Sequence, residues 1–403
     1  MRLPLVSKSF ALILIAISIL FAMRQQAQAG GGCNNSPWGQ TTLAVPGHPT
    51  QLVFTPDACH AFLGLDTSNP RSQTGIGVFE RYNDTLKLVR VQPLESNPFG
   101  LSIVPGGRTL AVADDDYVVF VDVQRLLSNG GDPILGYTSD GDQPGTVDIK
   151  ISLDGRFAFA SDENINTITV IDLEKSRQSN FKNIVKVGQV PVEGAPTRLA
   201  LSPDGSRLYV TSEIALAKFA DPKACSEEGS RPNAPLTQPE GVLLTIDVLK
   251  AEHDPAHAVL ARSLAGCSPV RVALSPDGRV AWVTVRHADE LLAFDTAKLT
   301  ADPAHARLAQ VAVGKGPVGL GVIKNGALVV AGNADRFAPD QTTPRTITLV
   351  DAAKALAGQP AVVRTLTVGL FPREFTLSPD GFGLFLSNYS SDQITIFDTE
   401  KLP

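Results

Sequence analysis

The sequence predicts an all-β fold, a single seven-bladed β-propeller whose blades are four-stranded antiparallel sheets. Three observations support this prediction. One turn motif recurs seven times at a period near 50 residues, short apolar segments typical of strands flank each copy, and the last repeat lacks a fourth strand that is present near the start of the chain. The ring takes up residues 41–403, so we expect one domain.

The recurring turn is most complete as LSPDG, at Leu201–Gly205, Leu274–Gly278 and Leu377–Gly381. Weaker copies end at residues 58, 107, 155 and 326, so the seven ends lie 49, 48, 50, 73, 48 and 55 residues apart. Proline fixes φ, aspartate favours the next turn position, and glycine can adopt positive φ. Each copy therefore predicts a tight turn between the first and second strands of a blade.

The other strands of each blade follow this turn in a regular order. A second strand comes directly after it, as in Arg207–Glu213, and a third strand often ends in aspartate, as at Asp172 and Asp247. A fourth strand ends in glycine, as in Asn183–Gly188, and a proline a few residues later begins the next blade. Four short strands per repeat are typical of propeller blades.

The seventh repeat ends after its third strand, close to Lys401. The segment TTLAVPG, residues Thr41–Gly47, has the pattern of the missing fourth strand. We therefore expect this N-terminal strand to complete the last blade, which would close the ring and remove the exposed strand edges of an open array.

The repeat SPDG-x-x-LYVT, followed by an I-x-V-x-D strand and I-x-VG, resembles the YVTN family of β-propeller repeats. Blade four (LSPDGSRLYVTS) matches best, and blades one, two and six match loosely. The resemblance covers nearly the whole chain after its first 40 residues and implies the propeller fold. It implies less about function, because similar propellers include cell-envelope binding proteins, lactonases, and subunits that handle haem d1, copper or quinone cofactors.

Residues 1–29 have the features of a secretory signal peptide. Basic Arg2, Lys8 and Arg24 have no acidic counterpart there, and the apolar run Phe10–Ala22 precedes small residues suited to cleavage at Ala27–Ala29. The run is too short for a comfortable membrane span. We expect a secreted or periplasmic protein with a lead-in at 30–40 and no membrane span after cleavage.

The charge balance excludes two classes of partner. Without the three basic residues of the leader, 32 basic and 41 acidic residues remain, a net charge of −9. Nucleic acids and acidic membranes bind positive surfaces, so neither is an expected partner.

Four cysteines in an exported chain predict two disulfides, with three possible pairings. The propeller arrangement places Cys33 and Cys59 on one face and Cys225 and Cys267 on the other. The pairs 33–59 and 225–267 each stay on one face, and a bridge needs Cα atoms within roughly 7 Å. Four free structural cysteines remain the alternative. No cysteine pair has zinc-ligand or haem-attachment spacing, so we expect no metal site and no covalent haem.

A ligand of a propeller usually binds at the mouth, where the innermost strands begin. The candidates are the residues just after each linker proline: Gln51, Gly100, Thr146, Arg198, Arg271, Gly319 and Glu374, with Arg373 adjacent. Arg198 and Arg271 come from neighbouring blades and could hold a carboxylate or phosphate between two guanidinium groups. Alternatively, each arginine pairs with a local carboxylate such as Glu193 or Glu374.

Two further features lie on the same face. His287, beside Arg286, is the histidine best placed to act as an acid or base. An insertion in blade four, residues 214–240, is rich in proline, alanine and charged residues. Long loops in compact domains are usually functional or disordered. We expect this one to be a lid over the mouth or a partner-binding segment, tethered by the Cys225–Cys267 bridge.

The sequence contains no catalytic motif such as G-x-S-x-G or H-E-x-x-H. The leading interpretation is an exported binding or interaction protein without a cofactor, whose partner is a protein or a small anionic ligand at the top face. One alternative is a lactonase-like hydrolase that uses Arg198, Arg271, His287 and Glu374. Another is a propeller that holds a noncovalent redox cofactor such as haem d1 through His287.

Overall fold

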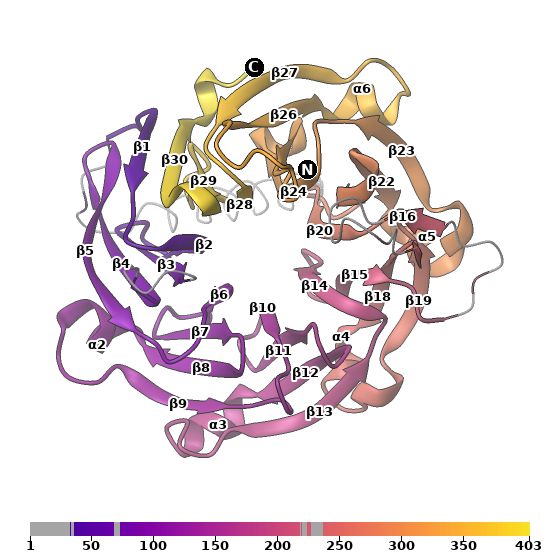
Figure 1. Ribbon diagram of the computed structural model, residues 1–403. Coiled ribbons are helices and arrows are strands. Elements are labelled where there is room, and N and C mark those ends of the chain that lie inside the picture. Colours follow the sequence, from indigo (N-terminus) through magenta and orange to yellow (C-terminus); the bar gives the residue numbers. More distant parts are fainter. Residues whose placement is uncertain (1–32, 34–35, 68–72, 218, 220–223, 227–236) are drawn as a thin grey trace, which may run out of the picture.

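The computed structural model describes residues 33, 36–67, 73–217, 219, 224–226 and 237–403. The predicted signal peptide, residues 1–29, lies outside this part of the chain. Seven four-stranded antiparallel sheets surround a central axis, and the chain passes around the ring from blade one to blade seven (Figure 1). The predicted seven-bladed β-propeller is therefore confirmed.

The first three blades each use four strands that are consecutive in the chain, ordered from the axis outward. Blade one consists of β2 (His48–Phe54), β3 (His60–Asp66), β4 (Gly75–Tyr82) and β5 (Thr85–Pro93). Blade two consists of β6 (Gly100–Ile103), β7 (Thr109–Asp114), β8 (Tyr117–Asp122) and β9 (Ile134–Thr138). Blade three consists of β10 (Thr146–Ile151), β11 (Phe157–Asp162), β12 (Thr167–Asp172) and β13 (Val185–Pro191).

Blades four to six repeat this order, with the insertion inside blade four. Blade four consists of β14 (Gly194–Leu201), β15 (Arg207–Ile214), β18 (Val242–Asp247) and β19 (Val259–Leu264). Blade five consists of β20 (Pro269–Leu274), β21 (Val280–Val285), β22 (Glu290–Asp295) and β23 (Arg307–Ala312). Blade six consists of β24 (Pro317–Ile323), β25 (Leu328–Asn333), β26 (Arg345–Asp351) and β27 (Val362–Val368).

Blade seven joins the two ends of the chain. Its strands are β28 (Pro372–Leu377), β29 (Gly383–Asn388), β30 (Gln393–Asp398) and, outermost, β1 (Thr41–Ala44). Beside it, Trp38 is only 1% exposed, and its indole lies edge-on to Phe385 with 4.8 Å between ring centres. Its Nε1 donates to Asp380 at 3.2 Å. The predicted closure is present, and the lead-in strengthens it with a buried aromatic side chain.

Hydrogen bonds between residues of the turn motif stabilise each copy of it. The hydroxyl of Ser202 donates to Asp204 at 2.5 Å, and Ser275 donates to Asp277 at 2.6 Å. The same carboxylates accept backbone N–H groups two residues on, and Gly205 has a φ of +72°, which favours glycine. Serine, aspartate and glycine each have a separate role in the turn.

The aspartates that end the third strands cap short helices, which the sequence did not predict. The Asp172 carboxylate accepts the backbone N–H of Lys175 at 2.8 Å, and Asp247 accepts that of Lys250 at 3.0 Å. These helices are α2 (Val123–Ser128), α3 (Leu173–Gln178), α4 (Val248–Ala251), α5 (Thr296–Ala301), α6 (Ala352–Leu356) and the 3-10 turn η6 (Thr399–Lys401). The other 3-10 turns are η1 (Pro255–His257), η2 (Arg286–Ala288), η3 (Pro303–His305), η4 (Lys324–Gly326) and η5 (Tyr389–Ser391).

Both disulfides have the pairing that stays on one face. Cys33 is bonded to Cys59 with Cα atoms 5.4 Å apart, and Cys225 is bonded to Cys267 with Cα atoms 5.6 Å apart.

In the part of the chain that the structure describes, no helix is long and apolar enough to cross a membrane.

Candidate functional site at the mouth of the propeller

The innermost strands begin at the face that also carries the second-to-third loops, here called the top face, and the mouth is the opening there. Most of these strands contain a bulge close to their first residue. The register shifts between Pro196 and Arg198 in β14, and between Pro372 and Glu374 in β28. A bulge changes the direction of the next side chains, so these positions point differently from a regular strand.

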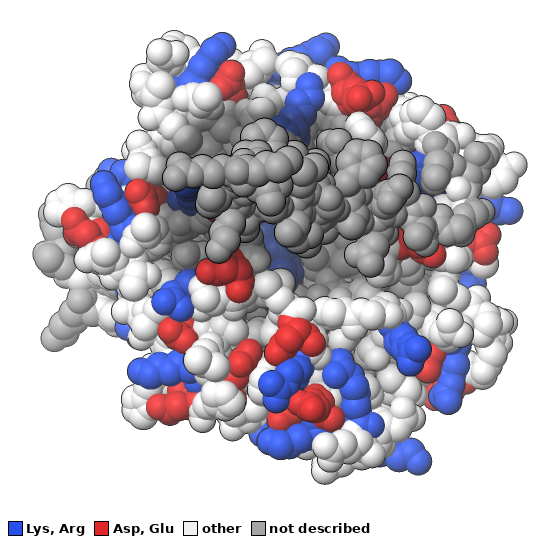
Figure 2. Space-filling view, turned by 180° about the vertical axis from the view of Figure 1, so that it is seen from behind, with Lys and Arg blue, Asp and Glu red and all other residues white. Residues whose placement is uncertain are grey.

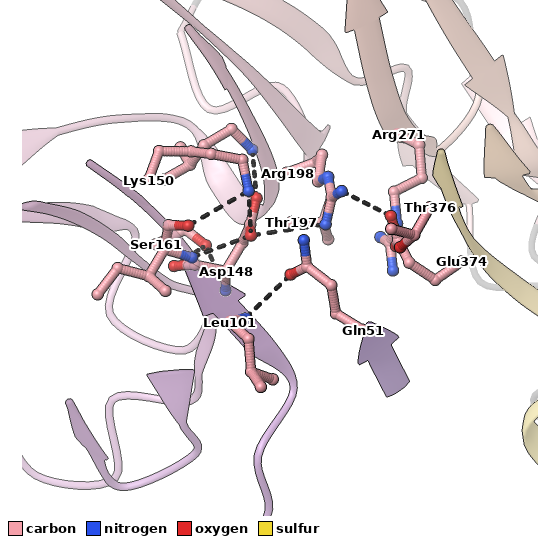
Figure 3. Close-up of polar contacts among 12 residues, drawn as sticks. Gln51, Leu101, Asp148, Lys150, Ser161, Thr197, Arg198, Arg271, Glu374 and Thr376 are labelled. Carbon is pink, nitrogen blue, oxygen red and sulfur yellow. Dashed lines mark hydrogen bonds and ion pairs between the residues drawn. The ribbon is translucent and has the colours of Figure 1, made fainter. Parts of the chain in front are cut away.

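Three of the sequence-predicted residues meet near the axis (Figure 3). Arg198 Nη2 lies 2.5 Å from Glu374 Oε1, and Arg271 Nε lies 3.0 Å from Glu374 Oε2. Glu374 is 4% exposed, so one buried carboxylate holds both guanidinium groups. The two arginines therefore converge as expected, but the contact observed is the alternative one, with a local carboxylate.

A fourth member of this group, Asp148 on β10, was not among the residues predicted from the sequence. Its carboxylate accepts the Leu199 backbone N–H at 2.9 Å and the Lys150 Nζ at 2.9 Å. Burial acts to raise its pKa, but the nearby charges of Arg198 and Lys150 hold that pKa below its ordinary value. We call Asp148, Lys150, Arg198, Arg271 and Glu374 the channel cluster.

In blade three the residue expected at the mouth, Thr146, lies two positions before Asp148, the residue found in the channel cluster. Counting from Pro144 placed Thr146 at the mouth, but the bulge of β10 lies between Thr146 and Asp148. Thr146 occupies the position that proline holds in β14, and its hydroxyl donates to Asp162 at 3.0 Å. Aligning the repeats by the bulge, and not by the proline, would have identified Asp148.

A cavity of about 90 Å³, here called the mouth cavity, adjoins the channel cluster through Arg271. Its charged lining residues are Arg271, Arg286, Arg336, Arg373, Glu163 and Glu213. The Arg286 guanidinium binds the Glu213 carboxylate with both Nη atoms, at 3.1 and 2.6 Å. A wider cavity of about 230 Å³, lined by inner strands, also contacts Arg198 and Arg271.

Arg373, unlike Arg198, Arg271 and Arg286, binds no carboxylate among the described residues. Its guanidinium carbon lies 5.0 Å from the centre of the Phe99 ring and 5.1 Å from that of Tyr389. Its Nη1 is buried, and no hydrogen-bond acceptor for it exists among the described residues. Burial and the neighbouring charge of Arg271 lower the pKa of Arg373 to about 10, so the group is still charged at neutral pH.

Arg336 also lacks an ion pair within the described ranges. Its guanidinium carbon lies 4.7 Å from the Phe337 ring centre and 5.7 Å from that of Phe371. Burial, with Arg286 second, lowers its pKa. Arginine–aromatic stacking leaves the edges of a guanidinium group free to donate hydrogen bonds. Among the described residues, no acceptor contacts the side-chain donors of Arg336, which is exposed, or the buried Nη1 of Arg373.

His287 lies in η2 and faces a different pocket, of about 480 Å³, together with Arg286, Arg336 and Lys315. The guanidinium of Arg286 donates to His287 Nε2 at 3.4 Å. Since a guanidinium only donates, His287 Nδ1 carries the ring proton and donates to the Ser268 hydroxyl, 3.0 Å away. The structure therefore does not bring His287 into the channel cluster with Arg198, Arg271 and Glu374.

The described ends of the insertion form a small hairpin close to this pocket. Strands β16 (Ala224–Ser226) and β17 (Thr237–Pro239) pair, and Cys225 joins them to the linker after β19. The side chain of Gln238 donates to the Ser268 hydroxyl at 3.0 Å, which continues to His287. The remainder of the insertion, whose lid role was predicted, lies mostly outside the described residues.

Basic and acidic side chains are interspersed around the rim of the ring (Figure 2). The chain as a whole has 35 basic and 41 acidic residues. The concentration of arginines in the mouth cavity is therefore a local feature of the structure, against an acidic average.

No known protein-family profile matches the chain, and a search of curated proteins finds no relative. Three solved structures are similar to it. Hydrazine synthase of Kuenenia stuttgartiensis is 20% identical with a TM-score of 0.63, covering 91% of this chain and 99% of that one. The β-propeller domain of Cps50 (Swd1) from Myceliophteria thermophila is 14% identical with a TM-score of 0.61, covering 90% and 99%. A chain of the mitotic checkpoint complex is 12% identical with a TM-score of 0.63, covering 91% and 96%.

At these identities the likeness concerns the fold alone. The β-propeller that the repeats predict is confirmed by the structure and by its neighbours, whereas membership of the YVTN family is not. By its structure, the chain is a seven-bladed β-propeller closed by its N-terminal strand.

Proposed function

We propose that this protein is an exported β-propeller that binds a small anionic ligand in the mouth cavity and carries out no chemistry on it. The observation that supports this best is Arg373, a half-buried residue whose Nη1 is buried without a hydrogen-bond acceptor among the described residues. A buried charged donor without an acceptor is costly, and a bound carboxylate or phosphate would satisfy it. The two disulfides support export, because such bonds persist in oxidising compartments.

The charge balance of the site favours an anion. The mouth cavity and the channel cluster together contain six basic side chains, Lys150, Arg198, Arg271, Arg286, Arg336 and Arg373. They contain four acidic ones, Asp148, Glu163, Glu213 and Glu374. The excess is two positive charges. Except for Arg336, which is exposed, these basic residues are buried or half-buried, so solvent screens them less and an incoming anion is attracted more strongly than at an exposed surface.

We favour binding over lactone hydrolysis because of the position of His287. A hydrolase of the expected kind would use this histidine with Glu374. His287 instead lines the separate pocket of about 480 Å³, where its two ring nitrogens contact Ser268 and Arg286.

Isothermal titration calorimetry with phosphate, acetate and malonate tests the proposal on the full exported chain. Arg373→Met keeps much of the side-chain volume and removes the charge, and we expect it to weaken anion binding by about 10- to 100-fold, the range of a charge-assisted hydrogen bond. The matched control is Arg279→Met, because the Arg279 side chain is 87% exposed in the turn between β20 and β21, away from the mouth. Absence of binding to the unaltered protein, or equal binding by the Arg373 variant, would contradict the proposal.

A further inference from the structure

We propose that the ligand of the mouth cavity is a small zwitterion of the amino-acid class, an inference that rests on the proposed anion site. Its carboxylate would bind Arg373 and Arg336, and its ammonium group would bind Glu163. The three side chains line one cavity. They come from opposite parts of the ring, since Glu163 follows β11 in blade three whereas Arg336 and Arg373 belong to blades six and seven (Figure 1).

Glu163 is held in place by its backbone and has an unused carboxylate. Its N–H donates to Gly145 O at 2.9 Å, and the next N–H, of Asn164, donates to Pro144 O at 3.0 Å. Among the described residues, no hydrogen-bond donor or ion-pair partner contacts the Glu163 carboxylate, whereas neighbouring Glu213 is fully engaged by Arg286. The cavity therefore has a free acceptor group on one side and free donors on the other.

The electrostatics of Glu163 favour a cationic partner. Burial, and then the charge of Glu213, raise the pKa of Glu163, and the opposing charges of Arg286, Arg271 and Arg373 offset this rise only in part. An ammonium group beside it would remove this repulsion and supply three N–H donors. A dianion, in contrast, would place its second negative charge against Glu163, whose carboxylate has no ion-pair partner among the described residues. The same cavity that favours one carboxylate near Arg373 thus disfavours a second one near Glu163.

The uncharged part of the cavity lining is mostly apolar. It consists of Phe371 and of Val147, Thr197, Val270 and Val318, which lie near the start of inner strands. These methyl groups are suited to the methylene groups that separate an ammonium from a carboxylate. The cavity volume of about 90 Å³ corresponds to roughly three water molecules, so it fits a short molecule such as glycine or β-alanine.

Calorimetry with matched ligand pairs tests the inference: glycine against acetate, and β-alanine against propionate, with ethylamine as the cation alone. We expect each amino acid to bind the unaltered protein at least tenfold more tightly than its matched acid. Glu163→Gln should abolish this preference while acid binding stays equal or improves. Glu80→Gln, at an exposed position on the outer part of blade one, is the matched control and should keep the preference.

The pH dependence provides a second measurement that needs no variant. As the pH is lowered towards the raised pKa of Glu163, protonation of its carboxyl group should reduce the preference for the amino acid over its acid. The charged groups that face it are Glu213, Arg271, Arg286 and Arg373, and the preference should begin to fall at a higher pH than for an ordinary glutamate. Equal affinity for glycine and acetate, or a preference that survives Glu163→Gln or does not change with pH, would overturn the zwitterion inference and leave the anion site standing. If neither the acids nor the amino acids bind, the proposed function fails as well.

Discussion

A pair of buried carboxyl groups at the junction of blades two and three should make the stability of this protein fall as the pH rises. Asp140 lies in the linker between β9 and β10, and both its side-chain oxygens are buried without a hydrogen-bond donor among the described residues. Asp162, which ends β11, accepts hydroxyl groups of three threonines at 2.7–3.1 Å. Burial, then the charge of Asp162, raise the pKa of Asp140 to about 8, and burial raises that of Asp162 to about 6.

With these pKa values the pair binds about one proton at neutral pH, mostly on Asp140. An aspartate in the unfolded chain has a pKa near 3.9, so between pH 4 and 8 the folded protein binds more protons than the unfolded one. The free energy of unfolding then decreases with rising pH, by at most about 1.4 kcal/mol per pH unit for one proton. From pH 5 to 8 this amounts to about 3–4 kcal/mol. The stability is fully present below pH 4 and lost as the pH passes through the raised pKa values. The nearby Lys186 ammonium moderates the effect by lowering the pKa of Asp140.

Asp140→Asn removes the part of this proton linkage that belongs to Asp140, because the amide is neutral at every pH and can donate a hydrogen bond to Asp162; the part that belongs to the buried Asp162 remains. We expect the variant to match the unaltered protein at pH 5 and to be about 3 kcal/mol more stable at pH 8. Urea unfolding followed by fluorescence of the buried Trp38 and Trp282 measures this difference at each pH. Asp142→Asn, two residues away and exposed, is the control and should leave the slope unchanged. Parallel pH profiles for Asp140→Asn and the unaltered protein would refute the argument.

Three further predictions concern the closure, the insertion and the channel cluster. Trp38→Ala should lower the free energy of unfolding by about 3–5 kcal/mol, because it empties a buried aromatic site beside the closing strand; a loss below 1 kcal/mol in urea unfolding would show that the indole does not lock the ring. Replacing Cys225 and Cys267 by serine should cost up to about 4 kcal/mol for a sequence separation of 42 residues; thermal unfolding unchanged by the replacement would contradict this. Glu374→Gln leaves Arg198 and Arg271 without their shared counter-ion and should destabilise the fold by about 3–5 kcal/mol; an unchanged urea midpoint would show that neighbouring groups compensate.

Much of the fold could be predicted because its signals are local. The LSPDG turn contains its own hydrogen bonds, such as that from Ser202 to Asp204, so the motif identifies a turn wherever it occurs. The short helices were missed because four to six residues contain no periodic pattern, although their capping residues, Asp172 among them, were visible as strand ends. Thr146 was placed at the mouth in error because a bulge changes the register without a sequence signal as clear as proline.

The number of blades, the strand that closes the ring and the cysteine pairs that stay on one face could all be predicted from the repeats, because each depends on short-range chemistry and on counting. Which charges meet is visible only in the folded ring. Glu374 binds Arg198, 176 residues away, and Arg271, 103 residues away, whereas Arg373 beside it has no carboxylate partner in the described part of the chain. Ring closure brings the first residues of seven inner strands to one axis. There the bulges change the direction of the side chains, and burial favours those charged groups that find a partner of opposite sign. The side chains left without a partner, and hence the candidate ligand site, are visible only in the folded ring.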